Sequence, residues 1–483
     1  MMKNGVMMQY FEWYMPNDGT LWRRLRDDAK HLAELGVSAV WVPPAYKCMT
    51  QDSVGYSPYD LYDFGEFDQK GTIRTKYGTR AEFEAAVAAL HAEGICVYLD
   101  TVLNHKAGAD EMERFYVVQV DAENRNREIS GSYEIEGWTS FTFPGRGERY
   151  SAFKWHWYHF SGLDYDAGRH EGGIFKIQGE GKEWCYAVDR EKGNYDYLMF
   201  ANIDYRHPDV VQEMLRWGCW VVEEYGLDGF RLDAVKHITR PFIRHFLDHV
   251  RAHTARPLYA VGEFWKYRQE DITPFLQEMD GRLELFDVPL HFRFHEASTM
   301  GAAFDLGGLL EGSLVQRYPT LSVTFVDNHD SQVGQALESP VQDWFKPAAY
   351  ALILLQKEGY PCIFYGDYYG TGGQPPLHRE VIETLLRLRH RCAYGEQRDY
   401  FDHRNTVGFT RSGDAAHPGS GLALLISNGE TGDKWMHVGT RHTGELWTEA
   451  TGCCPGRAVA IDAEGNGHFT VPSGKVAVWR PAH

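Results

Sequence analysis

The sequence has no continuous run of apolar residues as long as the roughly eighteen that a membrane-spanning helix needs. Its N-terminus also lacks a basic segment followed by a long apolar stretch and a small-residue cleavage site, which is the pattern of an export signal. We therefore expect no membrane partner. We predict a cytoplasmic protein, or a secreted one if a leader has been removed from the chain.

Basic residues are too few to balance the acidic ones. The chain carries 49 Lys and Arg residues against 67 Asp and Glu residues, which gives a formal net charge of −18. Such a charge repels the phosphates of nucleic acids and anionic lipids. A nucleic-acid partner is therefore not expected, and a neutral ligand fits the composition better.

Cysteines are few and follow no metal-binding or disulfide pattern. The 8 cysteines include no pair with CxxC spacing, and most lie inside apolar runs. Cys453 and Cys454 are adjacent, but a disulfide between neighbours is strained. We interpret all of them as reduced thiols, as in a reducing compartment. An HExxH motif is absent too, so no zinc site is expected.

Strand and helix patterns alternate along most of the chain. Thr79 and Glu82 form a predicted capping box at the start of one amphipathic run, and Pro208 opens another that Gly226 closes. Short apolar stretches between such runs are typical of buried parallel strands. These stretches are MMQYFEW, VSAVWVP, ICVYLDTVLNH, LDGFRLDAV, PLYAVGEF, ELFDVPL, SVTFVDN and PCIFYGD. The repetition predicts an α/β fold, a closed (β/α)8 TIM barrel.

Two parts of the chain depart from this alternation. The segment after the third strand lacks the expected helix and shows short strand patterns, and compact domains rarely contain structureless loops of that length. We therefore predict an inserted small β-rich domain at 105–206. Strand and turn patterns at the end of the chain predict an all-β sandwich domain at 396–483. The catalytic barrel then comprises 1–104 and 207–395.

Several of the predicted strands end in charged residues. In a barrel of this type, functional side chains lie at the carboxyl ends of the strands. Hydrolysis of a glycosidic bond needs a carboxylic acid that protonates the leaving oxygen and a carboxylate that acts as nucleophile or base. Asp233, Glu263 and Asp330 lie at or just after three such ends. We predict that they converge and that Arg231, on the same strand face as Asp233, keeps that carboxylate ionised.

These strand ends resemble a known family. The stretches DTVLNH, GFRLDAVKH, GEFW and FVDNHD are similar, in order and spacing, to the four conserved regions of the α-amylase family of glycoside hydrolases. The similarity extends to YFEWYMPNDG, NYDYLMFANIDYRHPDV and WFKPAAYALIL, and it is greatest for bacterial liquefying and cytoplasmic α-amylases. The resemblance implies that Asp233 is the nucleophile and Glu263 the general acid and base. It implies that Asp330 binds sugar hydroxyls and stabilises the transition state.

The same resemblance implies substrate-binding roles for neighbours of these carboxylates. They are Tyr56, His105, Arg231 and His329 at the central subsite and Lys236, His237 and Trp265 on the leaving-group side. For Tyr56 and Trp265 a place in the core is the alternative. For His105 and His329 the alternative is a purely structural role.

A single structural calcium ion is also implied by the resemblance. Its expected ligands are Asn104, Asp196, Asn202 and the backbone carbonyl of His237. The secreted relatives carry aspartate in place of Asn202, and acidic residues of an additional calcium and sodium cluster in place of Ser161 and Cys185. An amide contributes oxygen without charge, and a thiol is too soft for calcium, so we expect one weakly held ion and no second cluster. The alternative is that Asp196 and Asn104 only form hydrogen bonds across the domain junction.

The predicted activity is endo-hydrolysis of α-1,4-glucosidic bonds in starch, glycogen and maltooligosaccharides. We expect a retaining double displacement, carried out by a monomer. The alternatives are an exo-acting maltooligosaccharide-forming amylase and a transglycosylase of the same family, because both keep the same carboxylates. A glucan-binding protein without catalysis is disfavoured because all three carboxylates are present. An unrelated metal-dependent barrel enzyme is disfavoured because this sequence lacks the set of metal ligands that it would need.

Overall fold

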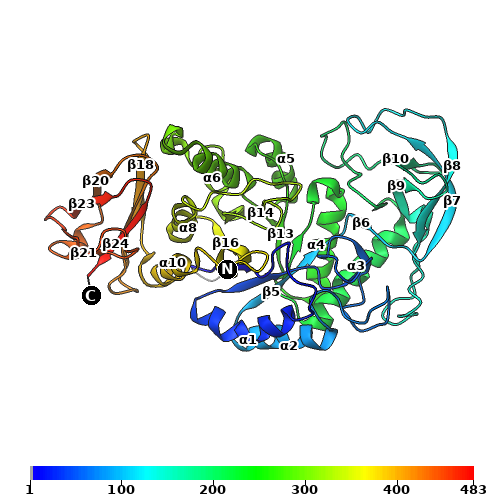
Figure 1. Ribbon diagram of the computed structural model, residues 1–483, viewed down its shortest axis with the longest axis horizontal. Helices are drawn as coiled ribbons and strands as arrows, with labels where there is room; N and C mark the ends of the chain where they lie inside the picture. The colour runs from blue at the N-terminus through cyan, green and yellow to red at the C-terminus, as the bar shows by residue number, and fades with distance from the viewer. Residues whose placement is uncertain (1–3, 483) are drawn as a thin grey trace.

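A computed structural model describes residues 4–482 of the chain. Figure 1 shows an elongated molecule with a barrel of strands and helices in the middle, a β-rich segment at one end and the C-terminal strands at the other. The strands β1, β2, β5, β12, β13, β14, β15 and β16 close the barrel, each parallel to its neighbours. The predicted TIM barrel with an inserted β-rich part after the third strand and a C-terminal β domain is confirmed.

The barrel strands are short and almost entirely buried. They are β1 (Met7–Gln9), β2 (Ala39–Val42), β5 (Cys96–Thr101), β12 (Gly229–Leu232), β13 (Tyr259–Gly262), β14 (Glu284–Phe286), β15 (Ser322–Phe325) and β16 (Tyr360–Phe364). The long helices between them are α1 (Leu21–Glu34), α2 (Arg80–Ala92), α3 (Pro208–Tyr225), α4 (Arg240–Thr254), α5 (Gln269–Met279), α6 (Val288–Met300), α8 (Lys346–Leu355) and α10 (Arg379–Cys392). Two short helices, α7 (Leu314–Arg317) and α9 (Tyr365–Tyr369), lie before β15 and after β16.

Local residue choice sets the helix ends. At α2 the Thr79 side chain accepts a hydrogen bond from the Glu82 N–H, and the Glu82 side chain accepts one from the Thr79 N–H, so the predicted capping box is formed. Pro208 occupies the first turn of α3, where the helix needs no N–H donor. Gly226 ends this helix with a φ of 67°, a left-handed conformation that glycine adopts without a steric penalty.

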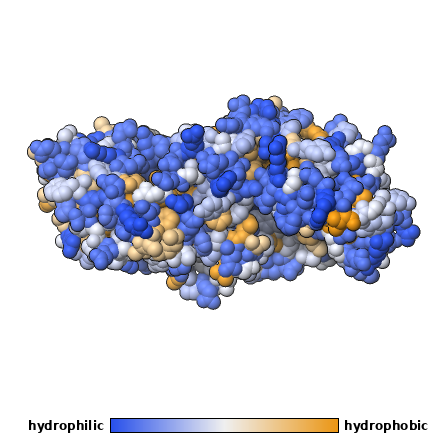
Figure 2. Space-filling model, turned by 90° about the horizontal axis from the view of Figure 1, so that it is seen from above, coloured by the Kyte–Doolittle hydropathy of each residue, from blue (hydrophilic) through white to orange (hydrophobic). Residues whose placement is uncertain are grey.

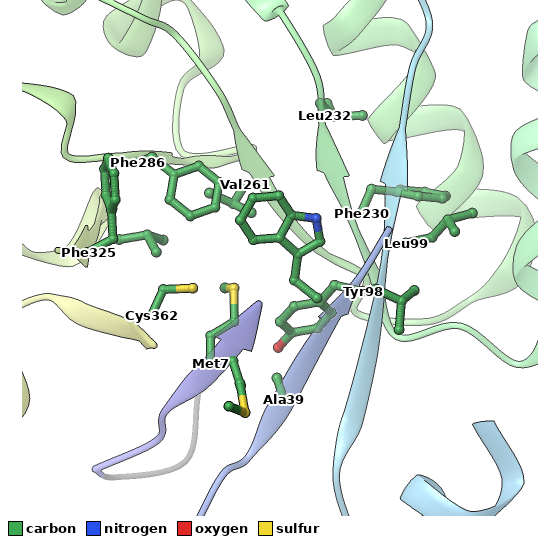
Figure 3. Close-up of a cluster of buried hydrophobic side chains, with 14 of the residues drawn as sticks. Met7, Ala39, Tyr98, Leu99, Phe230, Leu232, Val261, Phe286, Phe325 and Cys362 are labelled. Atoms are coloured by element: carbon green, nitrogen blue, oxygen red, sulfur yellow. The ribbon is translucent and has the colours of Figure 1, made fainter. Parts of the chain in front are cut away.

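Apolar side chains from the strands fill the core of the barrel. Met7 on β1 is the register partner of Ala39 on β2 and of Cys362 on β16, so these three residues lie at one level. Figure 3 shows them gathered with Val261 and other strand residues in a single cluster. Because the interior is packed, the loops at the strand ends remain for binding and chemistry.

The inserted segment forms a six-stranded sheet with antiparallel pairing. In sheet order its strands are β6 (His105–Lys106), β11 (Ala201–Ile203), β9 (Phe160–Asp166), β10 (Glu171–Ile177), β7 (Glu111–Gln119) and β8 (Tyr133–Ser140). The first of them, β6, follows barrel strand β5 closely, and β11 leads into α3. The pairing of His105 with Asn202 therefore holds the exit and the return of the segment together.

The C-terminal strands form two sheets that pack face to face. One contains β17 (Gln397–Tyr400), β18 (Thr406–Arg411), β19 (Leu422–Ser427), β24 (Val476–Pro481), β21 (Leu446–Glu449) and β22 (Ala458–Ala460), and the other β20 (Gly432–His437) and β23 (Asn466–Val471). Alternate residues of β19 serve two cores. Leu425 belongs to a cluster between the two sheets, whereas Leu424 belongs to the main cluster with the barrel. This double burial explains why β19 is apolar from Leu422 to Ile426.

Some local expectations were wrong. β1 ends at Gln9, whereas its pattern predicted a strand through Trp13. After Gln9 the Tyr10 N–H still donates to the carbonyl oxygen of Trp41 at 2.9 Å, whereas the Trp13 N–H donates to Gln332 Oε1 in the loop after β15 at 2.8 Å. A ribbon of β3 (Lys47–Cys48) and β4 (Pro58–Asp60) in the loop after β2 was not predicted.

The cysteines agree with the prediction of free thiols. All 8 are unpaired, and the Sγ atoms of Cys453 and Cys454 lie 3.7 Å apart, too far for a covalent bond. Within residues 4–482, no helix combines the length and the apolar character that crossing a membrane requires. Figure 2 shows a largely hydrophilic face with scattered apolar residues. The exact domain boundaries, at 104/105, 206/207 and 395/396, stay predictions.

Glu284 is a buried carboxyl at the start of β14. It is 7% exposed, lines a pocket of about 710 Å³ and accepts a hydrogen bond of 2.7 Å from the Tyr259 hydroxyl. Burial raises the pKa of Glu284 to about 7. Because this pKa lies above that of the unfolded chain, stability falls as pH rises from the unfolded pKa towards 7, by about 3 kcal/mol in total.

We therefore expect Glu284→Gln to melt a few degrees higher than the wild type at pH 8 and at nearly the same temperature at pH 4.5. Thermal unfolding at both pH values measures this. Glu430→Gln removes an exposed carboxylate and serves as the control. A melting difference that is the same at both pH values contradicts the prediction.

Candidate active site

The predicted carboxylates follow neighbouring barrel strands. Asp233 comes directly after β12 and Glu263 directly after β13, and the last pair of these parallel strands joins Leu232 to Gly262. The two carboxylates therefore lie at one level of the barrel mouth. Asp330 lies in the loop beyond β15, several residues after the strand ends. All three side chains belong to residues that are at most partly exposed.

A buried arginine links two carboxylates at the mouth of the barrel. Arg231 on β12 is 0% exposed, and its Nη1 donates to the carboxylates of Asp233 and Asp100, the latter at 2.9 Å. Asp100, on β5, also accepts hydrogen bonds from Trp41 Nε1 at 3.0 Å and from the Tyr56 hydroxyl at 2.8 Å. Burial raises the pKa of Asp100 to about 6, with nearby Asp233 adding to the effect and Arg231 opposing it. Asp100 thus orients both the arginine and the tyrosine.

Glu263 and Asp330 also have raised pKa values. Burial is the first cause that raises the pKa of Glu263, and the negative charge of Asp233 adds to it. Glu263 Oε2 also accepts a hydrogen bond of 2.9 Å from the Ala234 N–H. Burial, Glu263 and Asp233 together raise the pKa of Asp330 to about 8 against the opposing charge of Arg231. The arrangement therefore places one arginine-paired carboxylate beside two carboxyls that favour the protonated form.

An aromatic wall lies beside the carboxylates. The rings of Tyr56 and His329 are stacked with centroids 5.0 Å apart, and Trp13 stacks against both at 6.0 Å. The Gln9 amide donates to His329 Nδ1 at 2.9 Å, so a neutral His329 carries its proton on Nε2, which lies 3.2 Å from Asp330. Burial and then Arg231 lower the pKa of His329 well below its usual value. His329 is therefore a neutral ring beside Asp330, and among residues 4–482 its buried Nε2 has no hydrogen-bond partner.

The predicted leaving-group residues differ in accessibility. Lys236 Nζ donates to Glu191 and to the carbonyl oxygen of Trp265, both at 3.3 Å. Trp265 is only 8% exposed and packs its ring against Phe292. His237 is 3% exposed and bonds the carbonyl of Tyr195 through Nδ1. Of the three predicted residues, only Lys236 therefore has an accessible polar side chain.

The predicted calcium ligands come together between the barrel and the inserted sheet. The Asn104 amide faces the carbonyl oxygens of Asp196 and His237 at 3.5 and 3.4 Å. Ser161 Oγ donates to Asp196 at 3.2 Å and accepts from Asn202 Nδ2 at 2.8 Å. Asn202 Oδ1 is buried without a hydrogen-bond partner.

The chemistry of these groups fits a hard cation. His105 is neutral, because burial lowers its pKa, and its Nε2 faces the carbonyl of Tyr56 at 2.9 Å. Its Nδ1 then needs a donor, and the Asn104 amide at 3.2 Å supplies one only if its nitrogen points to the ring. In that orientation Asn104 Oδ1 faces two carbonyl oxygens. The three oxygens repel one another unless a cation binds between them. Burial also raises the pKa of the Asp196 carboxyl to about 7, a cost that a bound cation offsets.

Another group of potential metal ligands fits poorly. His159, His207 and Asp209 place one ligand atom each within 4.8 Å of one another. The backbone N–H of His156 donates to His159 Nδ1 at 3.0 Å, so the proton of the neutral ring is on Nε2. Burial lowers the pKa of His159 to about 3, so the ring stays neutral. His159 therefore has no free lone pair for a metal.

Sequence reasoning missed several residues of this site. Asp100 stands at the start of the quoted DTVLNH stretch, but only its contact with Arg231 reveals its role. Gln9 is the last residue of the first strand and Trp13 lies in the loop after it, where the other strands also carry functional groups, so their position was an available signal. Nothing in the pattern around Glu191 indicated its contact with Lys236.

Comparison with known proteins identifies the family. The model "Alpha amylase, catalytic domain" matches residues 19–414. A glucan 1,4-alpha-maltohexaosidase of Bacillus sp. (strain 707) is 52% identical, with 99% of this chain and 92% of that protein aligned. The cytoplasmic alpha-amylase of Escherichia coli (strain K12) is 43% identical over 99% of both chains. This chain therefore belongs to the α-amylase family, and it is a glycoside hydrolase.

Solved structures agree at the level of the fold. The alpha-amylase of Geobacillus thermoleovorans, solved as a complex with acarbose, aligns over 99% of this chain and 98% of its own with a TM-score of 0.66. The sequence identity in that alignment is 15%, so the likeness establishes the shared fold alone.

Proposed function

We propose that the protein is an endo-acting, retaining α-amylase that cleaves internal α-1,4 bonds of starch, glycogen and maltooligosaccharides. The observation that carries this proposal is the pairing of Asp233 with Arg231 beside two carboxyls of raised pKa, Glu263 and Asp330. A retaining glycosidase needs this difference, because one group attacks as a carboxylate while another must arrive with its proton.

In the proposed reaction Asp233 attacks the anomeric carbon while Glu263 donates its proton to the oxygen of the departing sugar. The glucosyl residue is then bonded to Asp233 as an ester. Glu263, now ionised, takes a proton from a water molecule that attacks the same carbon, and Asp233 leaves as a carboxylate. Asp330 binds sugar hydroxyls at the same subsite, with its position supported by His329.

The substrate-binding residues belong to the same proposal. Tyr56, His105 and His329 offer a ring face and two imidazoles beside the carboxylates, and Lys236 offers a charged donor on the leaving-group side. The relatives' names favour α-1,4-glucan as substrate, and the maltohexaosidase leaves the exo-acting mode as the second candidate. We further propose a monomer located in the cytoplasm, which the free thiols and the similarity to the Escherichia coli cytoplasmic enzyme support.

We propose one structural calcium ion held by Asn104, Asp196, Asn202 and the carbonyl of His237. The buried and unpartnered Asn202 Oδ1, together with the carbonyl oxygens facing Asn104, supports an all-oxygen site. Bound there, the ion would stabilise the junction between the barrel and the inserted segment. Because Ser161 and Cys185 offer a hydroxyl and a thiol instead of carboxylates, a second calcium is not expected nearby.

The endo-acting mode predicts a rapid fall in starch viscosity before appreciable reducing sugar appears. Retention predicts that the first products carry the α-anomeric configuration, because two inversions at the same carbon restore it. Viscometry together with proton NMR of early products measures both. Early β-anomers would contradict the mechanism. Release of one oligosaccharide from the start, without a viscosity drop, would favour the exo-acting candidate.

The calcium site predicts a stability that depends on the ion. Removal of calcium with a chelator should lower the melting temperature, and added calcium should restore it, because a ligand that binds only the folded state stabilises that state. Asn202→Asp adds a negative charge to the site and should therefore bind calcium more tightly. At low calcium concentration its melting temperature should fall less than that of the wild type. An unchanged melting temperature after chelation would refute the site, and two tightly bound calcium ions by elemental analysis would refute the single-ion stoichiometry.

A further inference from the structure

The return segment of the insertion crosses the ends of two barrel strands through a network of four charges. Asp189 and Glu191 lie on the segment, and Lys236 and Lys266 lie in the loops after β12 and β13. Lys266 Nζ lies 3.1 Å from Asp189 and 2.8 Å from Glu191. Glu191 Oε2 is in turn 3.3 Å from Lys236 Nζ. One carboxylate therefore bridges two lysines that come from adjacent strands.

Backbone contacts fix the segment against the same loop. The Asp189 N–H donates to the carbonyl oxygen of Lys236 at 2.9 Å, and the Arg240 N–H donates to that of Ala187 at 3.0 Å. The Tyr195 N–H donates to Asp189, which closes the turn that contains Glu191. The position of Glu191 is thus set by the main chain rather than by the lysines that it contacts.

The ammonium group of Lys236 has few fixed partners besides Glu191. It donates to the Trp265 carbonyl at 3.3 Å and lies 4.9 Å from the centre of the Tyr195 ring. Lysine has a flexible stem with many rotamers, and holding one of them costs conformational entropy. A bridging carboxylate reduces that freedom before a substrate arrives. Burial raises the pKa of Glu191, but hydrogen bonding to Lys266 and the charge of Lys236 outweigh it, so the net shift is downward.

We propose that Glu191 is a positioning residue that holds the Lys236 ammonium group on the leaving-group side of the cleft. Binding of the departing part of the glucan then depends on a residue supplied by the inserted segment. The ammonium group of Lys266 forms ion pairs with Asp189 and Glu191, and these pairs keep the Glu191 side chain in place. This inference rests on the proposed function, because it assigns Lys236 to leaving-group sugars.

If Glu191 had only a structural role, its removal would lower the melting temperature and affect all substrates alike. Glu191 is 36% exposed, and ion pairs of that exposure contribute little to folding. Its removal should therefore leave the melting temperature nearly unchanged while it alters how sugars bind on one side of the cleft. Substrates that occupy only the other side should not respond.

The test compares two substrates. Maltoheptaose places sugars on both sides of the scissile bond, whereas α-maltosyl fluoride has only fluoride on the leaving-group side. For Glu191→Gln we expect kcat/KM on maltoheptaose to fall roughly threefold to tenfold, mostly through KM, because one charged hydrogen bond is lost. On α-maltosyl fluoride kcat/KM should stay the same. Glu183→Gln, which removes a carboxylate paired with Lys176 in the same segment, is the matched control and should affect neither substrate.

A double variant separates positioning from other effects. If Glu191 acts through Lys236, then Glu191→Gln should have no further effect on maltoheptaose in a Lys236→Met background. Additive losses in the double variant, or equal losses on both substrates, would overturn the inference. Those outcomes leave the proposed function intact. A wild-type protein that cleaves neither substrate would instead refute the proposed function itself.

Discussion

The pairing of one buried arginine with two carboxylates is the constraint on which the rest of the site depends. A fully buried guanidinium must be neutralised, and Arg231 is neutralised by Asp100 on one neighbouring strand and by Asp233 at the end of its own. Arg231 forms no hydrogen bond to Glu263 or Asp330, although its charge lowers the pKa of both. Glu263 and Asp330 consequently face negative neighbours in a desolvated place, and the pKa of each is raised. In the proposed mechanism this difference separates the nucleophile, Asp233, from the acid, Glu263.

The fold meets this constraint by bringing strand ends together. Parallel strands β5, β12 and β13 are adjacent in the barrel, so residues that are far apart in the chain arrive at one edge. The loops and the inserted segment contribute further side chains to the site. Tyr56 comes from the loop after β2, and the inserted segment contributes Glu191 and the proposed cation ligands Asp196 and Asn202. Its two crossings, fixed by the pairing of His105 with Asn202, tie the wall of the cleft to the barrel.

The sequence alone predicted the larger features and the residues with a local signal. The barrel was visible in the repeated apolar stretches, and the α2 capping box was visible in the spacing of Thr79 and Glu82. What failed depended on distant contacts. The Trp13 N–H is bonded to the loop after β15 instead of a neighbouring strand, and the role of Asp100 arises from an arginine on another strand. No local pattern encodes such pairings, because the partners are set by the closure of the barrel.

We propose that Asp233, paired with Arg231, forms the covalent bond to the sugar while Glu263 donates and then accepts the proton. Mass spectrometry of Glu263→Gln incubated with α-maltosyl fluoride tests it most directly. Fluoride departs with little acid assistance, whereas hydrolysis of the intermediate lacks its base, so the glycosyl-enzyme should accumulate. We expect one added maltosyl group on the peptide that contains Asp233. An adduct on Asp330, or fluoride release that leaves no adduct while the product is β-maltose, would contradict it.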